Sequence, residues 1–138
     1  MAGTMPAYLR DAIMNHIAKL ATYTTPTTVY AALCKTAPTA AAAGTEITSG
    51  SNTGYVRVTL TLASLFSMAT GVLTTALDIL FPQNTGAGAW ESCTWVEFYD
   101  ASTAGNRCLP WLVLDSAVAC PINEQVKIPS GSGTETGS

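Results

Sequence analysis

The first segment of the chain carries its hydrophobic residues at helical spacing. Between residues 7 and 22, apolar side chains recur every three or four positions, and polar or charged side chains occupy the positions between them. This spacing places the apolar side chains on one face, so we predict an amphipathic helix that a Thr-Thr-Pro run at 24–26 ends. The apolar stripe consists of Leu9, Ile13, Ile17 and Leu20.

From residue 27 onward the pattern changes to the alternation that is typical of strands. Residues 55–62 alternate between apolar and polar side chains, which predicts a strand with Val56 facing the core and Tyr55 facing solvent. Stretches of small residues with Gly at 37–54 and 83–89 read as loops. Further strands are predicted at 27–34, 72–81, in a hairpin within 93–115, near 117–120, and at 125–128.

The number and spacing of these strands predict the fold class. About six to eight short strands, separated by turns after a single helix, are typical of an antiparallel β-sandwich or barrel. We therefore predict a mainly β fold, in which residues 1–25 form a helix packed on or extending from the domain and residues 26–129 form the β-sandwich. The tail at residues 130–138 has the composition of a linker and is predicted to be flexible.

Tryptophan, cysteine and acidic residues crowd into residues 93–115. A turn at residues 102–105 predicts a hairpin that pairs Phe98 with Leu109 and Tyr99 with Cys108. Both faces are then largely apolar, so one belongs to the core and the other is covered by the helix or by another subunit. Because Trp and Tyr are enriched at interface centres, the candidate interface residues are Trp95, Tyr99 and Leu112, together with Trp90 beside the 83–89 loop.

The chain is unusually poor in charge. Charged residues make up 11% of it, against roughly 25% in an average domain, and the net charge is −3. Without a basic cluster, neither nucleic acid nor an anionic membrane is an expected partner. The uncharged stretch from Val58 to Leu77 is rich in Ser and Thr, which predicts strand, turn and strand rather than a membrane span. A surface with few charges favours a protein whose natural state is an assembly.

Catalytic chemistry has few candidates in this sequence. A lone helical histidine such as His16 is more often solvated or packed than a general base. Glu97 and Asp115 have opposite strand parity, so they should point to opposite faces of the sheet rather than act as a pair. Neither G-x-S-x-G nor H-E-x-x-H occurs, and the glycines at 86–88 lack the Lys of a phosphate loop. We expect no enzymatic activity and no cofactor.

The cysteines leave several possibilities open. They form no C-x-x-C pair, so no metal site is expected. In the predicted hairpin, Cys93 and Cys108 lie about six residues apart along the strands, roughly 20 Å, which exceeds the Cα separation of about 7 Å that a disulfide allows. A bond between Cys108 and Cys120, a bond to another subunit, and free buried thiols all remain possible. The candidate disulfide residues are Cys34, Cys93, Cys108 and Cys120.

Several short sequences occur in a recognisable order. They run from "TTVYAALCKTAPT" and "GTEIT" through "GYVRVTL" and "ALDILFP" to "TWVEFYDAST", "GNRCLPWLVLD" and "VKIPSG". The most specific pieces are Phe81-Pro82, the "FYDA" turn at 98–101, and Gly105-Asn106. In this order the chain, over roughly residues 7–131, resembles a family of small virion proteins of tailed bacteriophages. Its members are often labelled tail fibre or minor structural proteins and include proteins that decorate or cement the capsid.

The resemblance implies a non-enzymatic β-sandwich that is assembled in the host cytoplasm and works in the virion. We expect first a capsid decoration or cement protein that binds between capsid subunits as a trimer or another homo-oligomer. Its partners would be itself and the major capsid protein or other virion proteins. The four cysteines are not part of the family pattern, so a role for them, such as covalent reinforcement of the particle, would be particular to this protein. A tail or fibre component is the alternative within this class. A carbohydrate-binding adhesive module is the alternative outside it, because an exposed aromatic such as Trp90 can stack on a sugar.

Overall fold

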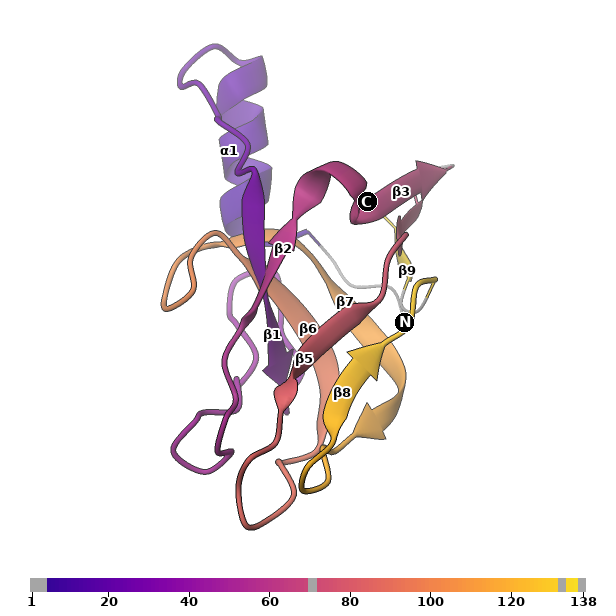
Figure 1. Cartoon of the computed structure of the whole chain (residues 1–138). Helices are drawn as coiled ribbons and strands as arrows, with labels where there is room; N and C mark the ends of the chain where they lie inside the picture. The colour runs from indigo at the N-terminus through magenta and orange to yellow at the C-terminus, as the bar shows by residue number, and fades with distance from the viewer. Residues whose placement is uncertain (1–4, 70–71, 132–133, 137–138) are drawn as a thin grey trace.

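The computed structural model describes residues 5–69, 72–131 and 134–136. A single helix, α1 (Ala7–Ile17), precedes a run of short strands, and all strand pairs are antiparallel (Figure 1). The predicted fold class, mainly β with one N-terminal helix, is confirmed. The strands are β1 (Thr28–Cys34), β2 (Val58–Thr61), β3 (Phe66–Ala69), β4 (Val72–Thr75), β5 (Ile79–Gln83), β6 (Cys93–Tyr99), β7 (Arg107–Val118), β8 (Gln125–Ile128) and β9 (Thr134–Thr136), with a 3-10 turn at Leu62–Ser64.

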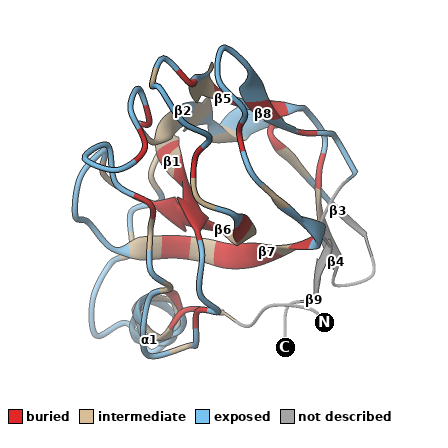
Figure 2. Ribbon diagram, turned by 90° about the horizontal axis from the view of Figure 1, so that it is seen from below, coloured by how far each residue is buried: buried red, intermediate tan, exposed pale blue. Residues whose placement is uncertain are grey.

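The strands form three sheets around one core. Their orders are β2-β1-β6-β7, β5-β8 and β3-β4-β9. The apolar core lies between the first two sheets, and α1 lies on the opposite side of β7 from β5 and β8 (Figure 2). Pro110 lies within β7, which is an edge strand of its sheet and so tolerates a residue without a backbone N–H. The largest fully buried core side chains include Phe81, Phe98, Leu33, Ile47, Ile79, Leu112 and Ile128.

The alternation at residues 55–62 predicts the structure only from Val58 onward. Strand pairing begins at Val58, so the side chains before it need not alternate between the two faces of a sheet. The Tyr55 side chain therefore turns inward and is 4% exposed, whereas Val56 is 60% exposed, the reverse of the prediction. The Tyr55 ring meets the Trp90 ring edge-on at 5.5 Å, and its hydroxyl accepts a hydrogen bond from the Leu33 N–H.

Other element boundaries also differ from the prediction. The predicted strand 72–81 is two strands, β4 and β5, which belong to different sheets. The predicted short strand near residue 117 is the end of β7, which continues to Val118. Within the segment predicted as the tail, Thr134–Thr136 pairs with β4 as β9. Helix α1 ends at Ile17, before the last residue of the predicted apolar stripe.

Candidate functional site

The hairpin of β6 and β7, on which the sequence concentrates its aromatic residues, has an irregular register. Phe98 pairs with Leu109 as predicted, but Tyr99 pairs with Arg107 and not with Cys108, because the register shifts between Phe98 and Tyr99. A shift of one residue turns side chains to the other face of a strand. Cys108 and Leu112 consequently belong to the buried core together with Phe98.

Three of the four candidate interface residues lie inside the folded chain. Leu112 is fully buried, Tyr99 is 6% exposed and Trp90 is 2% exposed. The Trp90 indole N–H donates to the Thr53 carbonyl at 3.0 Å, so both its ring and its polar atom are occupied within the domain. These three side chains cannot form the exposed contact surface, or the sugar-stacking platform, that the sequence suggested. Trp95 is half-buried and alone among the four keeps part of its surface outside.

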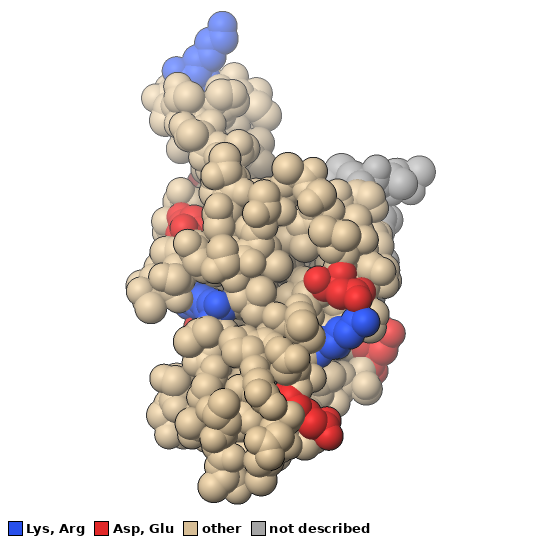
Figure 3. Space-filling view, in the orientation of Figure 1, with Lys and Arg blue, Asp and Glu red and all other residues tan. Residues whose placement is uncertain are grey.

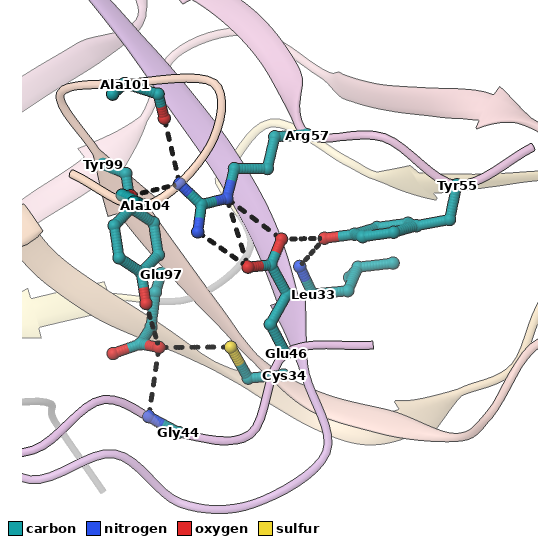
Figure 4. Close-up of polar contacts among 10 residues, drawn as sticks. All are labelled: Leu33, Cys34, Gly44, Glu46, Tyr55, Arg57, Glu97, Tyr99, Ala101 and Ala104. Carbon is teal, nitrogen blue, oxygen red and sulfur yellow. Dashed lines mark hydrogen bonds and ion pairs between the residues drawn. The ribbon is translucent and has the colours of Figure 1, made fainter. Parts of the chain in front are cut away.

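Strand β6 carries a buried carboxylate, that of Glu97, which is 1% exposed. Its Oε2 accepts hydrogen bonds from the Cys34 thiol, the Gly44 N–H and the Tyr99 hydroxyl, each at 3.1 Å (Figure 4). Its Oε1 lies 3.1 Å from Nη1 of Arg107. A carboxylate in the interior is stable only when it is paired and hydrogen-bonded, and Glu97 meets both conditions. It therefore ties β1 to the hairpin.

The same arginine holds the long loop that follows β1. Arg107 donates from Nη1 to the Thr39 carbonyl at 2.7 Å and from Nη2 to the Ala40 carbonyl at 3.0 Å. The Ala40 carbonyl also accepts the Ala7 N–H at 2.8 Å, at the start of α1. One buried side chain thus links the hairpin, the loop and the base of the helix.

A second arginine fixes the tip of the hairpin. The Arg57 guanidinium forms a bidentate pair with Glu46, donating from Nε to Oε1 and from Nη2 to Oε2, and its Nη1 donates to the carbonyls of Ala101 and Ala104 (Figure 4). It also lies 3.8 Å from the centroid of the Tyr99 ring, in cation–π geometry. Because a planar guanidinium makes all these contacts at once, this arrangement is rigid and structural.

All four cysteines are free thiols in the structure, and all are buried. Cys108 and Cys120 therefore form no bond with each other within the chain, and a bond to another subunit stays a prediction. Burial raises the pKa of Cys93 to about 11 and that of Cys108 to about 12. It also raises the thiol pKa of Cys34, which the neighbouring Glu97 carboxylate raises further. Such thiols are protonated at neutral pH and poor nucleophiles.

The other residues considered for chemistry lie apart. His16 is exposed on α1, where its Nδ1 accepts the Tyr23 N–H at 3.2 Å, and Asp115 is exposed whereas Glu97 is buried. Within residues 5–69, 72–131 and 134–136, His, Cys, Asp and Glu side chains nowhere gather in a group of three that could hold a metal ion. In the same part of the chain, no helix has the length and apolar character needed to span a membrane.

Exposed hydrophobic side chains concentrate at the free end of α1, which projects from the β-domain (Figure 1). Met14 is 59% exposed, Ile17 is 68% and Leu20 is 78%, and together they form what we call the α1 apolar surface. Charged side chains are sparse and scattered over the visible face of the molecule (Figure 3). Of the predicted stripe, Leu9 is buried, so only the base of the helix finds cover in its own chain.

Comparison with known proteins adds one relationship. A family model described as podophage GP4 fiber I protein gp80 matches residues 4–136. No curated protein matches the chain significantly.

Proposed function

Because the chain belongs to the podophage GP4 fiber I protein gp80 family and is a phage virion structural protein, we propose that it is a subunit of a virion fibre. The observation that carries the proposal is the extent of the match, from residue 4 to residue 136. A fibre role takes precedence over the capsid role that the sequence suggested first, since the family description names a fibre. This fibre role was the alternative within the same class.

We also propose that the protein is not an enzyme and acts by binding. Its buried polar side chains support this, because the ionic groups of Glu97, Arg107, Glu46 and Arg57 satisfy one another and backbone atoms. A catalytic side chain, by contrast, must have hydrogen-bonding or charged atoms that are free to face a substrate. The rigid β-domain is then a scaffold for contacts made at its surface.

The partner that we propose for the α1 apolar surface is a second copy of this chain. Met14 and Ile17 are three residues apart on a helix and therefore neighbours on its surface, and Leu20 lies three residues beyond the end of the helix. Virion appendages are built by repetition, and contact between copies would remove these three side chains from water. A modest contact of this kind gains strength when many copies assemble.

This contact can be tested by measuring the mass of the protein in solution. We expect the wild type to be an oligomer in light scattering, and Ile17→Ser with Leu20→Ser to shift it toward monomer. Leu77→Ser is the matched control, because Leu77 is also half-exposed but lies away from α1. A wild-type monomer at every concentration, or an oligomer that survives both α1 substitutions, would reject this contact.

Capsid decoration is the second candidate function. The compact domain favours it, since the residues that the structure describes fold around one core and form no elongated shaft. The two roles predict different positions on the particle. A decoration protein would cover the head shell evenly, whereas a fibre subunit would lie at discrete appendages.

Immunogold labelling of intact particles, with a gel of separated heads and appendages, distinguishes the roles. We expect label at appendages and the protein band in the fraction that contains them. Label spread over the head shell would replace the fibre proposal with decoration. A particle without the protein would overturn both.

A further inference from the structure

Helix α1 ends in a Schellman motif that turns the chain back along the helix. Lys19 adopts a left-handed conformation with φ 58°, its N–H donates to the His16 carbonyl, and the Leu20 N–H donates to the Asn15 carbonyl. The hydrogen bond from the Tyr23 N–H to His16 Nδ1 then holds the returning segment beside the helix. The last turn of α1 and residues 21–23 are thereby fixed side by side.

A cleft of about 320 Å³ lies between α1 and this returning segment. One helix face lines it, since Tyr8, Asp11 and Asn15 follow the i, i+3, i+7 spacing of a single face. Thr22 and Tyr23 line the other wall, and Ala12 and Ala21 complete the lining. This face is not the one that carries Met14 and Ile17, so the cleft and the α1 apolar surface lie on different sides of the helix.

The polar side chains of the cleft have almost no partners inside the chain. Across the described residues, the Tyr8 and Tyr23 hydroxyls, the Asn15 amide and the Thr22 hydroxyl make no hydrogen bond, and Asp11 uses only Oδ1, with Arg10. Burial, with smaller effects of nearby Cys108 and Tyr8, raises the pKa of the Tyr23 hydroxyl. The contrast with the arginine networks of the β-domain is clear, because there every ionic group is occupied.

From this combination of groups we propose that the cleft binds a neutral saccharide unit of a bacterial surface glycan. A sugar ring has an apolar C–H face that packs on an aromatic ring, and Tyr8, 43% exposed, offers such a ring. Vicinal hydroxyls need adjacent acceptors and donors, which a carboxylate such as Asp11 and an amide such as Asn15 supply. The volume is at the lower end of the range for small-ligand sites and suits one or two sugar rings.

The position of the cleft also suits this ligand. It runs along α1 from Tyr8 at the base of the helix to Asn15, toward the end that projects from the β-domain (Figure 1). Nucleic acid is a poorer match, because the negatively charged Asp11 lines the cleft and, among the described residues, Arg10 is the one cation paired with it. We therefore propose this cleft, and not Trp90, as the carbohydrate-binding site, since Trp90 is buried.

The inference rests on the proposed fibre function for its biological reason, namely that a fibre meets the cell surface. The test uses the full chain, first on a printed array of bacterial surface oligosaccharides. The tightest array ligand is then titrated calorimetrically against the wild type, Tyr8→Ala and Asp11→Asn. Ser102→Ala is the matched control, because Ser102 lines a separate cleft of about 300 Å³. Circular dichroism and melting temperature verify that each variant is folded, as expected for exposed positions.

We expect at least one saccharide to bind the wild type, and Tyr8→Ala and Asp11→Asn each to weaken binding about tenfold or more, with Ser102→Ala unchanged. Saturation-transfer NMR should show contact between the sugar and the tyrosine rings. The proposal would be overturned if the wild type bound no saccharide on the array. It would also be overturned if folded Tyr8→Ala and Asp11→Asn bound the saccharide as tightly as the wild type. Sugar binding by a protein that immunogold places on the head shell would instead overturn the fibre role and leave the site standing.

Discussion

Arg107 and Glu97 form a buried ion pair beside the turn of the β6–β7 hairpin, with Nη1 and Oε1 3.1 Å apart and side chains that are 10% and 1% exposed. The pair joins the neighbouring strands β6 and β7, and Arg107 also holds the loop backbone at residues 39 and 40, which is distant in sequence. Its main role is therefore to fix the loop after β1 and the base of α1 to the sheet.

Removing one member of this pair should destabilise the protein strongly. Arg107→Met keeps most of the side-chain volume but leaves the Glu97 carboxylate buried without its cation, which typically costs about 3–5 kcal/mol of unfolding free energy. Urea denaturation monitored by tryptophan fluorescence measures the change. Lys127→Met is the matched control, because its ion pair with Asp78 is exposed and should contribute little. Similar midpoints for both variants would contradict the structural role of the pair.

The hairpin turn should tolerate only glycine at residue 105. Gly105 has φ 78°, and a Cβ there would lie 2.6 Å from the Asp100 Oδ1 and 2.8 Å from the Ala101 Cβ. We expect Gly105→Ala to lower the unfolding free energy by at least about 1 kcal/mol, measured by thermal denaturation. Gly88→Ala is the control, because a Cβ at residue 88 meets no atom within 4 Å. A melting temperature equal to that of Gly88→Ala would show that the turn adapts.

The cysteines should be unreactive in the folded protein. Because all four thiols are buried and free, we expect Ellman's reagent at pH 8 to label almost none of them before unfolding and all four in concentrated urea. A non-reducing gel of purified particles should show the monomer band. Rapid labelling of the native protein would place at least one thiol at the surface, and a dimer band would revive the inter-subunit bond.

Stability should fall in alkaline solution. Folding raises the thiol pKa of Cys93 from 9.0 to about 11 and that of Cys108 from 9.0 to about 12. Above pH 9 the unfolded chain therefore releases protons that the folded chain keeps, so the unfolding free energy decreases as pH rises toward 11 and 12. Urea midpoints between pH 7 and pH 11 measure the slope. Cys108→Ala should reduce the decline, and an unchanged slope in that variant would contradict the assignment.

Local sequence patterns were sufficient for the class of fold and for the position of the hairpin. Alternating apolar residues between turns predict strands wherever they pair, and the pairing of Phe98 with Leu109 follows from the turn at residues 102–105. The same patterns found the helix but not its covered length. Whether Ile17 and Leu20 are buried depends on how far the β-domain extends along the helix, and a local sequence pattern cannot predict that extent.

The candidate sites depended on contacts between distant segments. Trp90 and Tyr99 look like surface aromatic residues in the sequence. In the structure the Trp90 indole N–H donates to the Thr53 carbonyl, and the Arg57 guanidinium lies over the Tyr99 ring. The cleft beside α1 had one readable signal in the sequence, the i, i+3, i+7 spacing of Tyr8, Asp11 and Asn15, but the apolar stripe of the same helix was the stronger pattern. Its second wall exists only because Lys19 reverses the chain.

By itself, then, the sequence determined an antiparallel β-domain with an N-terminal helix, because side-chain periodicity and turn residues act over a few positions. Only the tertiary structure decided which aromatic residues are buried, which face of the hairpin each side chain takes, and that the tail supplies β9. The physical reason is that one bulge shifts a strand register by one residue and exchanges its faces. Bulges and edge pairings are selected by the packing of the whole core, to which every distant strand contributes.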